Sequence, residues 1–375
     1  MNEIIPAEVS PPGEYIKREL DARGWTQADL AEILGRAVQT VSDLINGKRG
    51  VTPETATGLA AAFGTTAQIW MNLQTSYDLW HANRRGGTGD VSRRAQLYSF
   101  APINHMTKRG WIQGSDNVEV LEQRVLEFYR IKSLEEKPYV FKVAARKSAS
   151  YEVEPPPTLK AYLLRARQLA PAVSVGVFSE TSLNRALVQL KVLRHSPEEL
   201  RHIPRILAEA GIRFLIIEPL PQTKIDGACF GLDDKSPVIV ISFRYDRIDW
   251  FWHTLMHEMG HLVNKDGDTW DDLFGEPATD KPEAEGLADA FAADYLVPRS
   301  DLDDFIARIR PLYSKLKIQQ FAARMGVHPG IVIGQLQHEQ EISYAQNREM
   351  QVKVRHIVIE AALTDGWGHI LPATL

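Results

Sequence analysis

The run from Asp249 to Val263 constrains this chain more than any other part of its sequence. Its apolar residues recur at three- and four-residue spacing, which predicts a helix that is buried along one face. His257 and His261 lie one turn apart in this run, so their imidazoles share a face and can bind one tetrahedral metal ion. Glu258 follows the first histidine and can take the proton of a water that the metal activates. The run therefore predicts a catalytic metal centre.

A second amphipathic segment, residues 283–296, supplies the other groups that such a centre needs. A catalytic zinc ion is usually held by three protein ligands and keeps one position open. Glu285 can be the third ligand, while Asp289 can accept a hydrogen bond from the free N–H of a ligand histidine. Glu283 falls on another face and is the weaker candidate. We therefore predict Zn²⁺ as the cofactor.

Two other interpretations of this pattern stay open. The centre can hold zinc in a structural or sensory role without any peptidase activity. His257 and His261 can also be two polar residues on a solvated helical face, which the presence of Glu285 and Asp289 disfavours.

Two short segments rich in β-branched residues precede the metal-binding run and are bounded by Pro and Gly. Residues 213–218 and 238–243 therefore predict strands of a small sheet, and residues 227–232 are a candidate third strand between them. An extended substrate can add to the edge of such a sheet, and we expect this near residues 227–232. Tyr245 and His328 are further candidates for contacting substrate or stabilising an oxyanion, although such side chains more often only pack or form hydrogen bonds.

The N-terminal segment reads as a bundle of short helices. Helices are predicted over residues 12–23, 27–34 and 39–45 and from residue 53 onward, separated by Gly or Asn-Gly stops. Thr26 and Thr52 are suited to cap the second and fourth helices. Two helices joined by a short Gly-containing turn have the geometry that lays a recognition helix in the major groove of DNA.

Polar residues around the third helix are the candidates for DNA contacts. Base-reading candidates stand at its exposed start, namely Arg36, Gln39, Thr40 and Asp43. Phosphate-contacting candidates are Gln27, Lys48 and Arg49. Acidic residues balance the basic ones in this segment, so useful affinity should need a homodimer on a two-fold double-stranded DNA site. The alternative is a helix-turn-helix that only docks another protein.

The spacing of apolar residues changes along the chain and divides it into segments. The fold class that these segments predict is α+β. We expect an all-α helix-turn-helix bundle, followed by a mainly helical zincin-like domain with a small β-sheet. The predicted segments are a helix-turn-helix domain (1–82), a basic Gly-rich linker (83–116), a helical connecting region (117–200), a zincin-like core (201–300) and a helical C-terminal region (301–375). The Pro-rich stretch 151–157 predicts a loop within the connecting region.

Composition limits the setting of this chain. A net charge of −5 does not by itself indicate nucleic-acid binding, but it averages over the domains. No apolar run reaches the roughly 20 residues that span a bilayer, and no secretory signal is seen, so we expect a cytoplasmic protein with no membrane contact. The lone Cys229 excludes an internal disulfide and reads as a small buried residue of a strand. The acidic stretch 266–272 lacks EF-hand spacing and predicts a loop near the cleft.

Two family resemblances add to this reading. Residues 32–35, 39–42 and 44–50 resemble an Xre-type helix-turn-helix, and residues 52–54, 61–65 and 70–74 narrow the likeness to the HigA-type antitoxins. Residues 257–261 and 285–298 resemble the gluzincin plan and, more closely, the ImmA/IrrE family of zinc metallopeptidases. That likeness extends over about 200–340. Asp289 stands where this family often has Asn, and either side chain can orient a ligand histidine.

These resemblances imply a DNA-binding transcriptional regulator that carries a zinc-dependent endopeptidase. Its substrate would be a repressor or antitoxin-like protein, cleaved in a stress response. The alternative is a HigA-like antitoxin or repressor whose zinc domain is sensory or structural. A third hypothesis is a protein that binds a cognate toxin and has only incidental DNA affinity.

Overall fold

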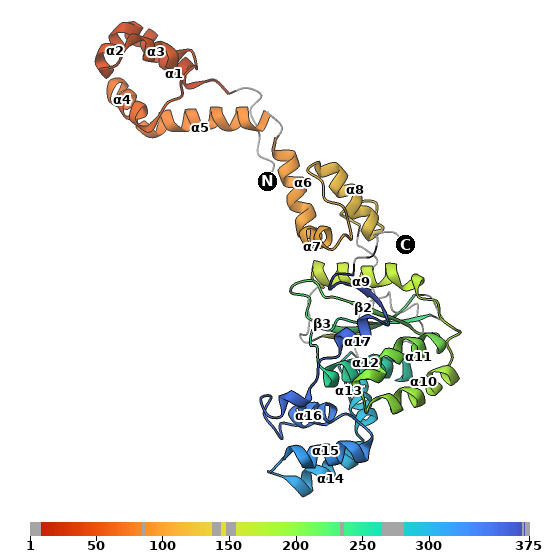
Figure 1. The fold of residues 1–375 in the computed structure, drawn as a ribbon. Coiled ribbons are helices and arrows are strands. Elements are labelled where there is room, and N and C mark those ends of the chain that lie inside the picture. Colours follow the sequence, from red (N-terminus) through yellow and green to blue (C-terminus); the bar gives the residue numbers. More distant parts are fainter. Residues whose placement is uncertain are drawn as a thin grey trace. The chain divides into compact units, whose positions relative to one another are not determined.

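The computed structural model describes residues 9–84, 87–136, 144–147, 155–232, 236–264, 281–369 and 371. The chain forms two compact units, residues 1–95 and 96–375, which are treated separately below (Figure 1). Within the described residues, no helix combines the length and the apolar character needed to cross a membrane.

The regular structure in the described residues of the first unit is all α-helical, as the sequence predicts. Its helices are α1 (Pro12–Arg23), α2 (Gln27–Leu34), α3 (Val38–Ile45), α4 (Pro53–Phe63), α5 (Ala67–Arg84) and the first part of α6 (Gly87–Phe100). A capping box starts α2: the backbone N–H of Thr26 donates to Asp29 Oδ2 at 2.7 Å, and the Asp29 N–H donates to Thr26 Oγ1 at 3.2 Å. Gly24 and Gly35 end α1 and α2 in the left-handed region.

One apolar core holds these helices together. It is centred on the fully buried Ile16, Val41, Leu59 and Trp70. Helices α1 and α3 meet closely, because a Cβ atom added to Gly13 would lie 2.2 Å from the Ile45 carbonyl oxygen. The predicted helix-turn-helix bundle is therefore present as a packed unit.

The prediction of a basic linker over residues 83–116 is wrong. Helix α5 continues to Arg84, α6 begins at Gly87, and α7 spans Ile103–Lys108. Leu97 and Trp111 are fully buried in the second unit. Apolar residues at helical spacing after the Gly-rich start give this segment a face to bury, and burying that face outweighs the local preference for a loop.

Among the described residues, a five-stranded sheet forms the centre of the second unit. Its strands are β1 (Ala144–Lys147), β2 (Arg213–Ile217), β3 (Ile225–Gly231), β4 (Pro237–Ile241) and β5 (Leu363–Asp365). They lie in the order β1-β3-β4-β2-β5. Strand β3 pairs antiparallel with β1 and β4, whereas β2 pairs parallel with β4 and β5.

Both faces of the sheet are covered, so the second unit has three layers (Figure 1). Along β2, Leu215 and Ile217 face one core, while Phe214 and Ile216 face the other, as the two-residue period of a strand requires. The core that Leu215 and Ile217 face is called the first core of this unit, and it also contains α7, α8 (Val118–Tyr129) and α9 (Pro157–Leu169). The core on the other face of the sheet is called the second core. Cys229 faces the second core, which confirms its reading as a small buried residue.

The remaining helices build the second core. They are α10 (Glu180–Leu193), α11 (Ile203–Glu209), α12 (Ile248–Asn264), α13 (Lys281–Leu296), α14 (Arg299–Ile309), α15 (Lys315–Met325), α16 (Pro329–His338) and α17 (Arg355–Ile359). Short 3-10 helices cover Ala170–Ala172, Pro197–His202 and Arg348–Met350. Three strands were expected here and are confirmed as β2, β3 and β4.

Strands β1 and β5 differ from expectation, since the segments 117–200 and 301–375 were predicted as helical. Strand β1 also bears on the idea that a substrate adds to a sheet edge near residues 227–232. Strand β3 pairs with β4 over Gly227–Gly231 and with β1 over Gly227–Cys229, so residues 227–229 have no free edge and the idea is wrong for them. Of the predicted loop 151–157, residues 151–154 lie outside the described residues, and α9 begins at Pro157.

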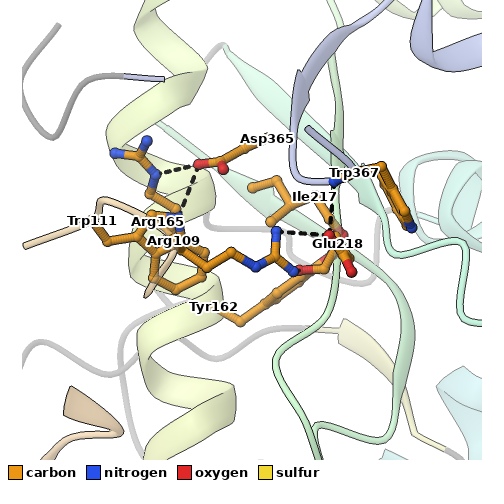
Figure 2. Close-up of polar contacts among 8 residues, drawn as sticks. All are labelled: Arg109, Trp111, Tyr162, Arg165, Ile217, Glu218, Asp365 and Trp367. Atoms are coloured by element: carbon orange, nitrogen blue, oxygen red, sulfur yellow. Dashed lines mark hydrogen bonds and ion pairs between the residues drawn. The ribbon is translucent and has the colours of Figure 1, made fainter. Parts of the chain in front are cut away.

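A buried ion pair joins β5 to α9, a helix of the layer that covers one face of the sheet (Figure 2). Arg165 of α9 places its Nε 2.6 Å from Asp365 Oδ2, and the two side chains are 0% and 1% exposed. Trp111 Nε1 donates to the same Asp365 oxygen at 3.1 Å. Beside them, Arg109 pairs with Glu218 at 3.0 Å, and Glu218 accepts the backbone N–H of Trp367 at 2.8 Å. These contacts join segments that are far apart in the chain.

Candidate metal centre

Helix α12 lies at the heart of the second unit, between the sheet and α13. Most of its residues are buried, as the apolar spacing predicts. Gly260 allows α13 to approach closely, because a Cβ atom there would lie 3.1 Å from the Cα of Ala288. The two helices run antiparallel at this point, since His257 faces Asp289 and His261 faces Glu285.

Three side chains converge where α12 and α13 meet. His257 Nε2 lies 3.2 Å from His261 Nε2 and 3.3 Å from Glu285 Oε2. His261 Nε2 lies 3.9 Å from Glu285 Oε1. Together these residues form a candidate metal-ligand group whose ligand atoms all lie within 4.8 Å of one another.

The spacing of these atoms suits zinc. Ligands at about 2.0–2.1 Å from a tetrahedral Zn²⁺ lie roughly 3.3–3.4 Å apart. The distances from His257 Nε2 to His261 Nε2 and to Glu285 Oε2 match that value, whereas the longer distance from His261 Nε2 runs to the other carboxylate oxygen of Glu285. Two imidazoles and one carboxylate are also a donor set that zinc prefers in catalytic sites. The residues therefore fit a zinc ion.

Asp289 orients the first of these histidines. Its Oδ1 lies 2.8 Å from His257 Nδ1, so the proton on Nδ1 points at the carboxylate and Nε2 is left to face the metal position. Burial lowers the pKa of His257, but the hydrogen bonds with Asp289 and Glu285 outweigh it and raise the pKa to about 9. A metal ion therefore has to displace a proton from this imidazole at neutral pH.

Glu258 lies on the side of α12 that faces the sheet, and its side chain is fully buried. Strand β3 approaches it through Gly227, where an added Cβ atom would lie 2.7 Å from Glu258 Oε1 and from Thr254 Cγ2. A side chain at position 227 would thus displace the carboxylate. Sequence reasoning used Gly227 only as part of a strand, and the sole signal for its role is a glycine inside a strand pattern.

The structure gives the two weaker candidates other contacts. Tyr245 is 40% exposed, its ring lies against Trp250, and its hydroxyl accepts a hydrogen bond from Arg244 at 3.1 Å. His328 is the N-cap of α16, and its Nδ1 accepts the backbone N–H of Gly330 at 3.1 Å. Neither belongs to the metal-ligand group found among the described residues. The acidic stretch 266–272 lies outside those residues.

Three consecutive aromatic residues lie near the start of α12. Phe251 and Trp252 are buried in the core. Trp250 is only partly buried and lines a pocket.

In the first unit, the candidate DNA-contacting residues gather around α3. Gln27, Gln39, Lys48 and Arg49 are exposed. Gln39 Nε2 donates to Asp43 Oδ1 at 2.8 Å, so Asp43 orients the amide of Gln39. Arg36 pairs with Glu54 of α4 at 3.2 Å, while Thr40 is partly buried at the start of α3.

Comparisons with known families match both units. Residues 16–70 match the helix-turn-helix family. Residues 208–336 match the family described as the IrrE N-terminal-like domain, a metallopeptidase-type domain. This second match includes β2, β3, β4, α12, α13 and most of α16, and with them His257, His261 and Glu285.

Individual relatives match the first unit. Antitoxin HigA-1 of Vibrio cholerae is 47% identical over 75 residues, which are 20% of this chain and 70% of that protein. The uncharacterized HTH-type transcriptional regulator YddM of Escherichia coli is 36% identical over 86 residues, 23% of this chain and 88% of that protein. The solved Pseudomonas aeruginosa antitoxin HigA with higBA promoter is 35% identical, with a TM-score of 0.21, and covers 22% of this chain and 90% of that one. Through its first unit the chain therefore belongs to the HigA-type helix-turn-helix proteins, and its second unit carries an IrrE-like metallopeptidase domain.

Proposed function

We propose that the second unit is a zinc-dependent endopeptidase and that the first unit brings it to DNA. The observation that carries the proposal is the convergence of two imidazoles and the Glu285 carboxylate, with the buried Glu258 next to His257 in the same helix. A structural zinc site usually has four protein ligands, whereas three ligands and a neighbouring carboxylate are typical of a hydrolytic site.

His257, His261 and Glu285 would hold the zinc ion. Zinc in this position would supply Lewis-acid activation of water and of the scissile carbonyl. Glu258 would accept the proton of the attacking water and later donate it to the leaving amine. Its buried position against Gly227 fixes where its carboxylate lies. Asp289 would act as a positioning residue by keeping Nε2 of His257 turned to the metal.

Cleavage assays with candidate substrates test the reaction. The family resemblance suggests a repressor or antitoxin-like protein, so purified Xre-type repressors are the first substrates to try. We expect cleavage by the zinc-loaded wild type and a loss of at least about 100-fold in Glu258→Gln, because the general base is removed. Cleavage that survives this substitution would remove Glu258 from the mechanism.

For the first unit we propose binding to double-stranded DNA as a homodimer. The similarity to Antitoxin HigA-1, together with the exposed Gln39 and Lys48, supports this assignment. Gln39 would read a base edge, with Thr40 and Arg36 beside it, and Gln27, Lys48 and Arg49 would contact phosphates. A combined Gln39→Ala and Thr40→Ala variant should lose sequence-specific footprints on its operator. Unchanged footprints would refute the recognition-helix assignment.

A second candidate function is a HigA-like regulator or antitoxin whose metal domain has a sensory or structural role and cleaves no protein. One observation favours it: Antitoxin HigA-1 matches this chain only in the first unit. In that case the Glu258→Gln variant would regulate its operator as the wild type does, and no repressor would be cleaved. Operator release that depends on Glu258 would instead support the peptidase.

A further inference from the structure

A pocket of about 490 Å³ opens along the same helix pair, one turn beyond the metal centre. Residues of helices α12, α13, α14 and α16 line it. The position of the pocket follows from the residues that face one another along α12 and α13. His261 faces Glu285, and His257 faces Asp289 one turn earlier on α12. One further turn along, His253 and Ala293 line the pocket. Asp289 itself belongs to the lining, so one side chain borders both the pocket and a metal-ligand histidine.

The pocket wall is mostly apolar, and Gln335, one of its residues, carries an unsatisfied polar atom. Trp250, Leu296, Val297 and Ile331 are among the lining residues. Gln335 also lines the pocket and is 8% exposed, and its Nε2 donates to the Ala293 carbonyl at 2.8 Å. Its Oε1 is buried and has no hydrogen-bond partner among the described residues. A buried acceptor of this kind costs free energy unless a donor reaches it.

The charges of the lining also favour a ligand that carries hydrogen-bond donors. It contains two guanidinium groups, and both are engaged: Arg247 with Asp249 at 2.5 Å, and Arg299 with Glu339 at 2.6 Å. Two more carboxylates belong to the lining. Asp289 accepts from His257, and Asp294 accepts the backbone N–H of Arg299 at 2.9 Å. The wall therefore offers carboxylate and amide oxygens and carries a net negative charge.

We propose that this pocket binds a small organic cation, with an apolar body and a head rich in N–H donors such as an amine or amidine. The apolar wall takes the body, and the lining carboxylates of Asp289 and Asp294, together with Gln335 Oε1, take the head. The coupling to zinc rests on the function proposed above. A cationic head that hydrogen-bonds to Asp289 competes with the His257 imidazole for that carboxylate, so the ligand and the metal weaken each other's binding.

Benzamidine, an aromatic ring with a cationic N–H-rich head, is the probe for the pocket. Calorimetric titration of the full-length Glu258→Gln protein should show saturable binding of benzamidine and none of benzoate. Ala293→Phe fills the pocket and should weaken binding at least about 10-fold. Asp294→Asn, a gentler change of an exposed side chain, should weaken it about three- to fivefold. Asp304→Asn, on α14 but outside the lining, is the matched control and should leave it unchanged.

Absence of saturable binding, or binding that neither lining variant alters, would overturn the site. Because this titration uses a protein without the proposed general base, a failed peptidase assay does not affect its outcome.

The coupling is tested by competition with a zinc chelator, with and without benzamidine. We expect benzamidine to lower the zinc affinity about 10-fold in the wild type, and zinc to lower the benzamidine affinity by the same factor. The effect on zinc should vanish in Asp289→Ala, which lacks the shared carboxylate. Benzamidine binding that leaves the zinc affinity unchanged would keep the pocket but overturn the coupling.

Discussion

Two polar clusters in the second unit are built from similar side chains but differ in how their charges are completed. Around Asp365, a carboxylate and the Arg165 guanidinium lie 2.6 Å apart and are almost entirely buried (Figure 2). Around His257, the imidazole is 1% exposed, while its partners Glu285 and Asp289 are 39% and 56% exposed. One cluster is closed, and the other reaches solvent.

The difference in charge explains the difference in role. The Asp365 cluster contains both signs, so its buried carboxylate is neutralised by the protein itself. The metal centre combines two imidazoles with the carboxylates of Glu285 and Asp289, and with Glu258 nearby. That set needs a cation from outside, either protons or a divalent metal ion. A polar cluster that its own chain completes stabilises the fold, whereas one that is left open can bind.

The largest effect should come from breaking the closed cluster. Asp365→Ala leaves the Arg165 guanidinium buried without its carboxylate, which typically costs about 3–5 kcal/mol. Urea unfolding of the second unit should measure that loss in the free energy of unfolding. Asp304→Ala removes one partner of the exposed Arg308 pair and should cost less than about 0.5 kcal/mol.

The double variant Arg165→Met with Asp365→Leu sharpens this test. Replacing both charges by apolar side chains of similar size should recover most of the stability that Asp365→Ala loses. If the double variant is as unstable as the single one, Asp365 acts mainly through other contacts, such as that with Trp111.

A substitution in the open cluster should change the amount of bound metal more than it changes the free energy of unfolding. His257→Ala removes one of the three proposed ligands, and bound zinc should fall from about one ion per chain to nearly none. Metal analysis of the purified proteins measures it. His253→Ala, one turn earlier on the same helix, is the matched control. Equal zinc content in wild type and His257→Ala would refute the ligand assignment and the contrast between the clusters.

A smaller effect is expected from the residue that only orients a ligand. Asp289→Ala should lower the zinc affinity about 10- to 100-fold without abolishing binding, because His257 keeps its place but loses its partner on Nδ1. Asp289→Asn keeps a hydrogen-bond acceptor and should retain more of the affinity. Chelator competition measures both, with Glu283→Gln as a control on the same helix. A full loss of zinc in Asp289→Asn would make Asp289 a ligand.

The open cluster was predictable from the sequence because its members are close along the chain. His257 and His261 are one helical turn apart, and so are Glu285 and Asp289, so helical periodicity alone puts each pair on one face. The capping box at Thr26 and Asp29 was predictable for the same reason. What sequence reasoning added across elements was one assumption, that the two helices lie side by side.

The closed cluster could not be predicted, because its partners meet only after the sheet has formed. Arg165 and Asp365 are 200 positions apart, and nothing near either residue indicates the other. Strand β5 is three residues long and β1 is four, too short for a reliable periodic signal. The approach of Gly227 to Glu258 likewise depends on how β3 packs on α12. Contacts of this kind are set by tertiary structure.

The smallest predicted effect concerns His328, whose pKa is shifted in the opposite direction to that of His257. Burial lowers the pKa of His328, and the opposing influence of Glu198 and Asp249 does not restore it. The unfolded chain keeps a value near 6.5. As the pH falls through that value, the unfolded state takes up a proton before the folded state does, so His328 subtracts stability until the folded form is protonated as well.

His328→Asn separates the cap from the charge. Asparagine can still accept the Gly330 N–H as an N-cap, so at pH 8 the two proteins should differ by less than about 1 kcal/mol in unfolding free energy. Between pH 7 and pH 5 the wild type should lose more stability than the variant, which cannot titrate at this position. Urea unfolding at each pH measures the difference. Parallel pH profiles would mean that His328 has the same pKa in the folded and the unfolded state, which would contradict the effect of its burial.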